Sequence, residues 1–174
     1  MKFKELDPQN LKESPFSMID GGMLVTAGDR DKFNTMTASW GGLGVMWNKN
    51  VSYVVVRPTR YTYEFMEKQD RYTLSFFDSE YADALTICGT KSGRSTDKVK
   101  ETGLTPVFDG GSVYFGEARL VLICKKLYFQ DINPANFQDA MIDKLYPNKD
   151  YHRLYVGEVE TIYEKWIINP LDLQ

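Results

Sequence analysis

Four stretches decide the fold of this chain: Asn34-Thr-Met-Thr-Ala-Ser-Trp-Gly-Gly42, Val51–Val56, Arg57-Pro-Thr-Arg-Tyr-Thr-Tyr-Glu-Phe65 and Tyr72-Thr-Leu-Ser-Phe-Phe77. The first is rich in hydroxyl groups and ends in a tryptophan, which predicts a strand. The second is β-branched and gives the strongest strand prediction, Val51–Arg57, which Pro58 ends. A strand that finishes in arginines where a helix begins is suited to cradle a flat aromatic group that carries a phosphate.

Short strands and short helices alternate along the chain, without a repeat, a low-complexity segment or an interdomain linker. We expect a hairpin of Met23–Ala27 and Asn34–Trp40 around the turn Gly28–Asp31, and then a flexible break at Gly41–Gly44. Three further strands are expected: Tyr72–Phe77, one long strand at Val113–Phe129 bulged near Gly116, and a last strand at Arg153–Tyr163. Three helices are expected before the long strand: Tyr63–Lys68 capped by Thr62, Glu80–Cys88 capped by Ser79 and stopped by Gly89, and one near Asp97–Thr102 capped by Ser95 or Thr96 and ended by Gly103. A turn is expected at Asp109–Gly111, and a helix at Phe137–Lys144 within the irregular excursion Asn133–Asp150. About six strands at this spacing predict a mainly β fold with short helices, an antiparallel barrel rather than a doubly wound sheet.

Composition narrows the class of protein. At 174 residues and 20.0 kDa the chain fits one domain over 1–174, and 43% hydrophobic residues suffice for a real core. A net charge of −3 and a pI near 5.3 argue against a nucleic-acid partner. No secretory signal and no run near the ~18 apolar residues of a membrane span are visible. We therefore expect a soluble protein of the reducing cytoplasm, with no membrane partner.

The Asn34–Trp40 strand places Thr35, Thr37 and Ser39 on one face, because side chains alternate along a strand. Three hydroxyl groups in a row offer donors and acceptors to the edge of a polar ring. The alternative is the polar outer face of an ordinary strand, and the pattern alone does not exclude it.

Two further segments are candidates for anion binding. Arg57 and Arg60 flank the start of the helix after Val51–Arg57, where free backbone N–H groups and two guanidinium groups favour phosphate. The loop from Lys91 to Lys98 is rich in Gly, Ser and cations, and such a loop is able to wrap a phosphate. For both segments the alternative is a solvated, charged surface turn. No Walker or dinucleotide fingerprint is present.

Other reactive residues are few. Cys88 at a helix end and Cys124 in an apolar strand are expected to be apolar fillers, and no Cys-x-x-Cys pair exists. His152 is the only histidine, so a metal site is not expected. It is a weak catalytic candidate, since a lone histidine is more often a hydrogen-bonded structural residue.

The chain resembles the flavin reductase-like, FMN-binding split-barrel family, and within it the flavoredoxin branch. The segments that carry the resemblance, which spans roughly 15–165, are Asn34–Trp40, Arg57–Glu64, Ser92-Gly-Arg94 with Asp97-Lys98, and Tyr155-Val-Gly-Glu-Val159. The resemblance implies an antiparallel, Greek-key split β-barrel that forms a homodimer and holds FMN noncovalently near the subunit interface. Members pass electrons from a nicotinamide cofactor or another donor through the flavin.

Carried over residue by residue, the resemblance assigns the ring contacts to Thr37–Trp40, the ribityl phosphate to the segment from Arg57 to Thr62, and the closing loop to Lys91–Arg94. The full set of expected cofactor-binding residues is Asn34, Thr35, Met36, Thr37, Ala38, Ser39, Trp40, Arg57, Arg60, Tyr61, Thr62, Lys91, Ser92 and Arg94. His152 matches a position near the flavin in some relatives.

Three functional hypotheses remain open. The first is an FMN-dependent oxidoreductase, with NADH, NADPH or a protein as electron donor and a small molecule or a protein as acceptor. The second is a non-catalytic dimer that binds flavin or a phosphate ligand. The third is a dimeric barrel whose basic loops are only solvated.

Overall fold

In the computed structural model, residues 3–165 are described. They form ten strands and five α-helices, with three short 3-10 turns between them. The strands are β1 Phe3–Leu6, β2 Met23–Gly28, β3 Phe33–Ala38, β4 Gly41–Met46, β5 Lys49–Val56, β6 Arg71–Phe76, β7 Pro106–Asp109, β8 Ser112–Phe115, β9 Leu120–Asp131 and β10 Arg153–Lys165. The α-helices are α1 Pro15–Asp20, α2 Tyr61–Lys68, α3 Ala82–Thr90, α4 Lys98–Thr102 and α5 Ala140–Asp143.

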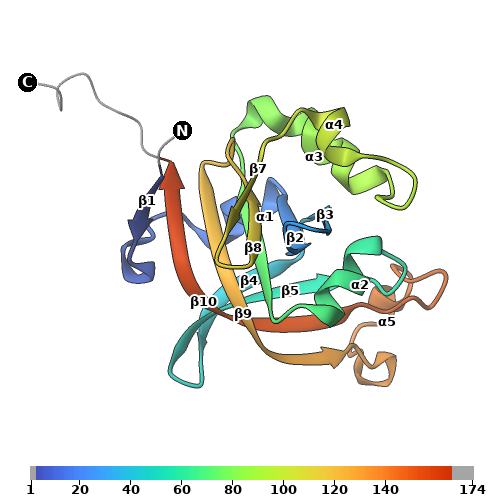
Figure 1. The fold of residues 1–174 in the computed structure, drawn as a ribbon. Helices are drawn as coiled ribbons and strands as arrows, with labels where there is room; N and C mark the ends of the chain where they lie inside the picture. The colour runs from blue at the N-terminus through green and yellow to red at the C-terminus, as the bar shows by residue number, and fades with distance from the viewer. Residues whose placement is uncertain (1–2, 166–174) are drawn as a thin grey trace, which may run out of the picture.

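One antiparallel sheet dominates the molecule. Its strand order is β3-β2-β6-β9-β10-β5-β4, and β1 pairs with the far end of β10. The long strands β9 and β10 curve through the centre, while β7 and β8 form a separate two-stranded sheet (Figure 1). The prediction of a mainly β, split-barrel fold with short helices is confirmed.

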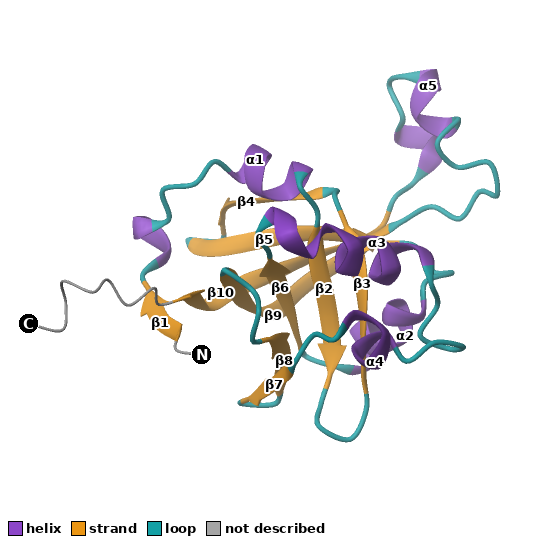
Figure 2. Ribbon diagram, turned by 90° about the horizontal axis from the view of Figure 1, so that it is seen from above, coloured by secondary structure: helices purple, strands orange, loops and turns teal. Residues whose placement is uncertain are grey.

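Two of the helices cover the hairpin formed by β2 and β3. α3 packs on β2 and β3, and α2 contacts the same two strands (Figure 2). The segment that contains α5 projects away from the body. Among residues 3–165, no helix is long and apolar enough to cross a membrane.

Several local predictions are wrong, each because a tertiary contact outweighs the local pattern. Gly41–Gly44 is no flexible break but part of β4, where a Cβ on Gly41 would collide with the Tyr53 carbonyl. The hairpin that joins β4 to β5 turns at Trp47 and Asn48, which both have positive φ; a two-residue turn of this kind suits the twist of the strands. The described residues hold ten strands rather than about six.

The predicted single strand Val113–Phe129 is two strands. The chain turns between β8 and β9, where the Gly116 N–H donates to Thr105 O and the Arg119 N–H to Phe76 O. β8 then pairs with β7, and β9 pairs with β6 and β10. The sequence does not reveal the turn between β8 and β9, because both strands bury apolar residues and the apolar pattern therefore continues from one strand into the next.

The helix caps also differ from the predictions. α2 begins at Tyr61, so Thr62 is inside the helix rather than its cap. Ser79 lies in a separate 3-10 turn, and α3 continues through Gly89 to Thr90. Asp97, not Ser95 or Thr96, caps α4 by accepting the Lys100 N–H at 3.1 Å. The helix predicted at Phe137–Lys144 is shorter, α5 alone.

A buried polar contact lies at the centre of the core. The Tyr72 hydroxyl and Ser52 Oγ are 2.7 Å apart, and Ser52 Oγ donates to Cys124 Sγ at 3.2 Å. Gly157 of β10 lies against the Tyr72 ring, at a bulge between β10 and β9. A Cβ built on Gly157 would be 2.8 Å from Tyr72 Cε1, closer than packed atoms tolerate.

Gly157→Ala is therefore expected to destabilise the fold by ~1–3 kcal/mol, the range for overpacking a filled core. Chemical denaturation monitored by circular dichroism measures the change. Gly21→Ala is the matched control, because a Cβ there meets nothing closer than 4.0 Å. Equal stability of the two variants would contradict the close packing of Gly157 on Tyr72.

Candidate functional site

Two adjoining cavities run along β3 and bring together most of the predicted site residues. The first, here called the β3 cleft, has a volume of about 290 Å³. It is lined by Met36, Thr37, Ala38, Ser39, Trp40, Val55, Arg57, Arg60 and His152. The second, here called the loop pocket, is about 100 Å³ and is lined by Asn34, Met36, Thr59, Arg60, Tyr61, Thr62, Thr90, Lys91, Ser92, Gly93 and Lys98. Met36 and Arg60 line both, so the two cavities adjoin at these residues.

β3 does not present its three hydroxyl groups to one ligand. Thr35 is buried, where its Oγ1 accepts from Thr26 Oγ1 at 2.9 Å and donates to Val25 O. It lines neither cavity. Thr37 lines the β3 cleft and donates its hydroxyl to Leu85 O of α3, whereas Ser39 follows the end of β3 and is exposed. Only Ser39 of this stripe keeps a hydroxyl without a partner among the described residues.

Two cations hold the C-terminus of α3 against β3. Arg60 donates to Gly89 O at 2.8 Å and to Cys88 O at 3.4 Å. Lys98 donates to Cys88 O at 2.9 Å and to Thr35 O at 2.7 Å. The last carbonyl groups of a helix lack intrahelical partners and carry partial negative charge, so cations stabilise them. These contacts set the position of α3 beside the loop pocket.

Lys98 is absent from the expected cofactor-binding residues, although the sequence places it in the cationic Lys91–Lys98 loop. It is only 6 % exposed and lines the loop pocket. Burial lowers the pKa of Lys98 to about 8. The Asp97-Lys98 pair is one of the segments that carry the family resemblance. A lysine in a Ser- and Gly-rich loop is nevertheless expected to be exposed, so the sequence alone does not indicate that Lys98 is buried.

Arg57 and Arg60 both line the β3 cleft, but only Arg60 also lines the loop pocket. Arg57 lines only the β3 cleft, where it pairs with Asp150 at 2.7 Å and donates to Leu145 O at 2.9 Å. Its guanidinium also lies 4.9 Å from the centre of the Tyr146 ring. Arg57 therefore fastens the excursion that contains α5 to the end of β5.

His152 closes the other side of the β3 cleft. Its Nδ1 lies 2.8 Å from the Tyr146 hydroxyl, and its ring centre lies 5.1 Å from that of Trp40. Burial lowers the pKa of His152 to about 4, and the charge of Arg57 acts in the same direction. The imidazole is thus neutral at pH 7 and offers hydrogen bonding and ring contact rather than charge.

The loop after α3 lies against β3 because Gly93 has no side chain. A Cβ there would approach Asn34 Cγ to 2.9 Å. Lys91 pairs with Glu101, and Ser92 Oγ accepts the Arg94 N–H at 3.2 Å. Arg94 does not line the loop pocket; its guanidinium lies 4.7 Å from the Tyr61 ring centre and contacts Glu64.

The buried contacts of α2 complete the loop pocket. Asn34 Nδ2 donates to Thr62 Oγ1 at 2.8 Å, which joins β3 to the first turn of α2. Both residues are buried, and Tyr61 packs edge-on against Phe65. This contact explains why Thr62 is not a cap: its hydroxyl is bound to Asn34.

The chemistry of the two cavities fits an aromatic phosphate ester. Arg60, Lys91 and Lys98 line the loop pocket together with the hydroxyl groups of Thr59, Thr62 and Ser92, and none of its described lining residues is acidic. The β3 cleft offers the Trp40 and His152 rings and the small Ala38 beside the backbone. A phosphate at one end and a flat ring at the other match these residues.

Neither cysteine fits a nucleophile. Cys88 and Cys124 are free and fully buried. Burial raises the pKa of both thiols, that of Cys124 to about 12. Within residues 3–165, no cluster of His, Cys, Asp and Glu has the arrangement to hold a metal ion.

The split sheet and a cleft with one cationic and one aromatic end define a barrel protein of the flavin-binding class. The family model described as "Flavin reductase like domain" matches residues 17–170, and the chain belongs to this family. No curated protein sequence matches it.

Solved structures with the same fold include flavoredoxins, as the sequence resemblance implied. Flavoredoxin of Desulfovibrio vulgaris (Miyazaki F) is 24% identical, with a TM-score of 0.65, over 95% of this chain and 77% of that chain. An FMN-binding domain of a flavin reductase-like enzyme from Shewanella baltica OS155 is 15% identical, with a TM-score of 0.67, over 94% and 77%. An FMN-binding protein from Thermus thermophilus is 20% identical, with a TM-score of 0.65, over 94% and 79%.

Proposed function

We propose that this protein binds FMN noncovalently along β3 and works as an oxidoreductase. Electrons would pass from NADH, NADPH or a reduced protein through the flavin to a small-molecule or protein acceptor. The observation that carries the proposal is that the loop pocket, with its three cations, adjoins the β3 cleft, with its aromatic walls. Free, buried cysteines support placing this activity in a reducing compartment, the cytoplasm.

Each end of the site has a defined task in this proposal. Lys98, Lys91 and Arg60 hold the phosphate, with the free N–H groups at the start of α2. The segment Thr37–Trp40 borders the isoalloxazine, whose redox chemistry the cofactor itself supplies. His152 stays neutral beside the ring and excludes water with Trp40. No thiol and no general base is required of the chain.

The alternative is a dimer that binds flavin or another phosphate ligand without turnover. The same cavities support it, because binding needs the cations and the rings but no electron donor. Reduction of the bound chromophore by a donor separates the two functions.

The proposal is tested by the chromophore of the purified protein. Mass spectrometry of the released ligand is expected to give FMN rather than FAD, since the loop pocket, with Arg60, Lys91 and Lys98 in its lining, has a volume of only about 100 Å³. Anaerobic addition of NADH or NADPH should then bleach the flavin absorbance. Bound FMN that no donor reduces would favour the non-catalytic alternative, and no uptake of FMN would overturn both.

FMN affinity should depend on the charge of Lys98. Its pKa is about 8 in the free protein, and a bound phosphate favours the protonated amine, so the pKa rises on binding. Well below pH 8, Lys98 is protonated in both the free and the FMN-bound protein. Above pH 8, Lys98 of the free protein is neutral and must take up a proton when FMN binds. The phosphate stays dianionic throughout, because its second pKa is about 6. We expect affinity to fall roughly tenfold between about pH 7.5 and about pH 9.5.

Fluorescence titration of FMN against the flavin-free protein measures this pH profile. Lys98→Met should bind more weakly with a flat profile. Lys100→Met, an exposed cation on the same helix, should keep the profile of the unmodified chain. A falling profile that survives in Lys98→Met would assign the titration to another group.

A homodimer is the last part of the proposal. The β4–β5 hairpin and β9 expose an apolar area, here called the hairpin patch, formed by Val45, Met46, Trp47, Leu127, Tyr128 and Phe129. Trp47 and Tyr128 are in ring contact, 6.1 Å between centres, so the hairpin and β9 meet there. Contiguous exposed apolar residues usually mark an interface.

Sedimentation at micromolar protein is expected to give about twice the chain mass. Val45→Glu, which places a charge in the hairpin patch at a site 70% exposed, should shift the protein towards the monomer. Phe16→Glu is the control, because Phe16 is 89% exposed but lies outside the patch. A dimer unchanged by Val45→Glu would place the interface elsewhere.

A further inference from the structure

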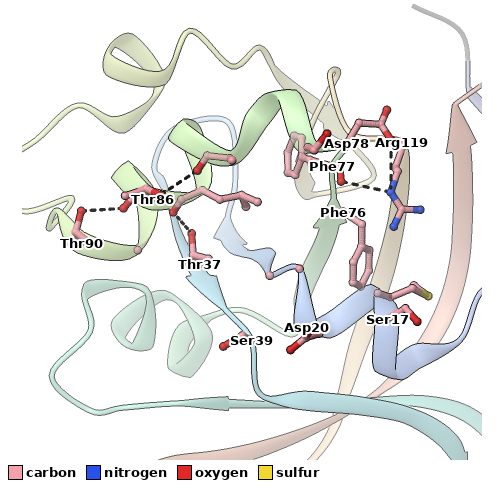
Figure 3. A pocket seen from close by; sticks show the side chains of 17 residues that line it. Ser17, Asp20, Thr37, Ser39, Phe76, Phe77, Asp78, Thr86, Thr90 and Arg119 are labelled. Atoms are coloured by element: carbon pink, nitrogen blue, oxygen red, sulfur yellow. Dashed lines mark hydrogen bonds and ion pairs between the residues drawn. The ribbon is translucent and has the colours of Figure 1, made fainter.

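A third cavity, of about 710 Å³, opens between α1 and α3 and is here called the α1–α3 pocket. Figure 3 shows Ser17 and Asp20 of α1 on one side and Thr86 and Thr90 of α3 on the other. Phe76, at the end of β6, points between them. The volume of the α1–α3 pocket lies in the ~300–1,000 Å³ range of small-molecule sites. None of the roles proposed above uses this pocket.

The α1–α3 pocket shares walls with both parts of the candidate flavin site. Thr37 and Ser39 line it and also the β3 cleft. Thr90 lines it and also the loop pocket. A ligand in this pocket would therefore lie beside a ring held in the β3 cleft, without needing the residues that hold the phosphate.

Charge limits what the pocket accepts. Arg119 is the only cation among its described lining residues, and its charge is paired with Glu13: Nη1 and Nη2 donate to Glu13 at 2.5 and 2.8 Å, and Nε donates to Phe77 O. Asp20 and Asp78 line the pocket as carboxylates. An anion would meet two negative charges and no free positive one, so phosphate-bearing and sulfonated ligands are disfavoured.

The remaining lining suits an uncharged planar molecule. Met18, Phe76, Phe77 and Leu85 provide apolar and aromatic surface. The hydroxyl groups of Thr86 and Thr90 are already bound to backbone carbonyls of α3. Those of Ser17 and Ser39 make no hydrogen bond to another described residue, so they are free to donate to a carbonyl oxygen.

We propose that the α1–α3 pocket is an acceptor site that binds a neutral, planar quinone-class compound next to the flavin. Binding rests on the pocket alone, whereas its role as acceptor rests on the proposed function. In that role the quinone takes two electrons and two protons and becomes a hydroquinone. The hydride of the nicotinamide donor and one proton from water supply them, and the oxidised nicotinamide is the other product.

The test measures binding without turnover. Equilibrium dialysis compares two probes with the same ring system, neutral hydroxymethyl-anthraquinone and anionic anthraquinone sulfonate. The neutral probe should bind the FMN-loaded protein, and the sulfonate about tenfold or more weakly, a difference of roughly 1.4 kcal/mol. The affinity of the neutral probe should be similar with and without FMN, because the two ligands occupy separate cavities.

A matched pair of variants locates the site. Ala82 lines the pocket and is exposed, so Ala82→Trp fills the cavity without disturbing the core. Asp83 is the exposed neighbour on α3 that does not line it. Ala82→Trp should weaken the neutral probe at least about tenfold, and Asp83→Trp less than about twofold. FMN affinity should be unchanged in both.

Three results would overturn the proposal: equal binding of the two probes, displacement of the neutral probe by FMN, or full binding to Ala82→Trp. Failure of the proposed function looks different. In that case FMN does not bind or is not reduced, while the flavin-free protein still takes up the neutral probe in an Ala82-dependent way.

Discussion

The contact between α3 and β3 is the interaction on which the candidate site depends. Arg60 and Lys98 bring two cations to the same helix end, where Cys88 O accepts from both. Burying a cation is costly unless it is hydrogen-bonded, and here the unpaired carbonyl groups of α3 and Thr35 O satisfy it. A hydrogen bond to a charged group is worth about 1.5–3 kcal/mol, so the arrangement fixes α3 firmly while leaving net positive charge beside the loop pocket.

This contact requires that the backbones approach closely, and glycine makes the approach feasible. A Cβ on Gly89 would come within 3.3 Å of Thr37 Cβ, and Gly93 leaves room for Asn34. Read in the sequence alone, Gly89 predicts a helix end and Gly93 belongs to a loop able to wrap a phosphate. In the fold both glycines let α3 and the loop after it pack closely on β3, because a missing side chain permits close contact.

Sequence patterns predicted the parts of the fold that depend on neighbouring residues. β2, β3 and β5 follow from β-branched and alternating residues, and the Asp109–Gly111 turn follows from its glycines. β4 was missed because its pairing with Tyr53 is a tertiary contact, and Thr62 was misread because its partner, Asn34, is 28 residues away. Thr35 was placed among ligand contacts although its hydroxyl belongs to the core, since alternation gives the face of a strand but not what covers it.

The contacts around the β3 cleft also join residues far apart in the sequence, so local sequence patterns do not predict them. Nothing local to Arg57 indicates that it will bind Asp150 and Leu145 O, and nothing local to His152 indicates the Tyr146 hydroxyl. These contacts join the excursion between β9 and β10 to the end of β5, so the excursion supports Arg57 and His152, which line the β3 cleft. The burial that results makes His152 neutral. Positive charge is thereby concentrated around the loop pocket, in Arg60, Lys91 and Lys98, while the β3 cleft has Arg60 at its junction with that pocket and Arg57, which is paired with Asp150.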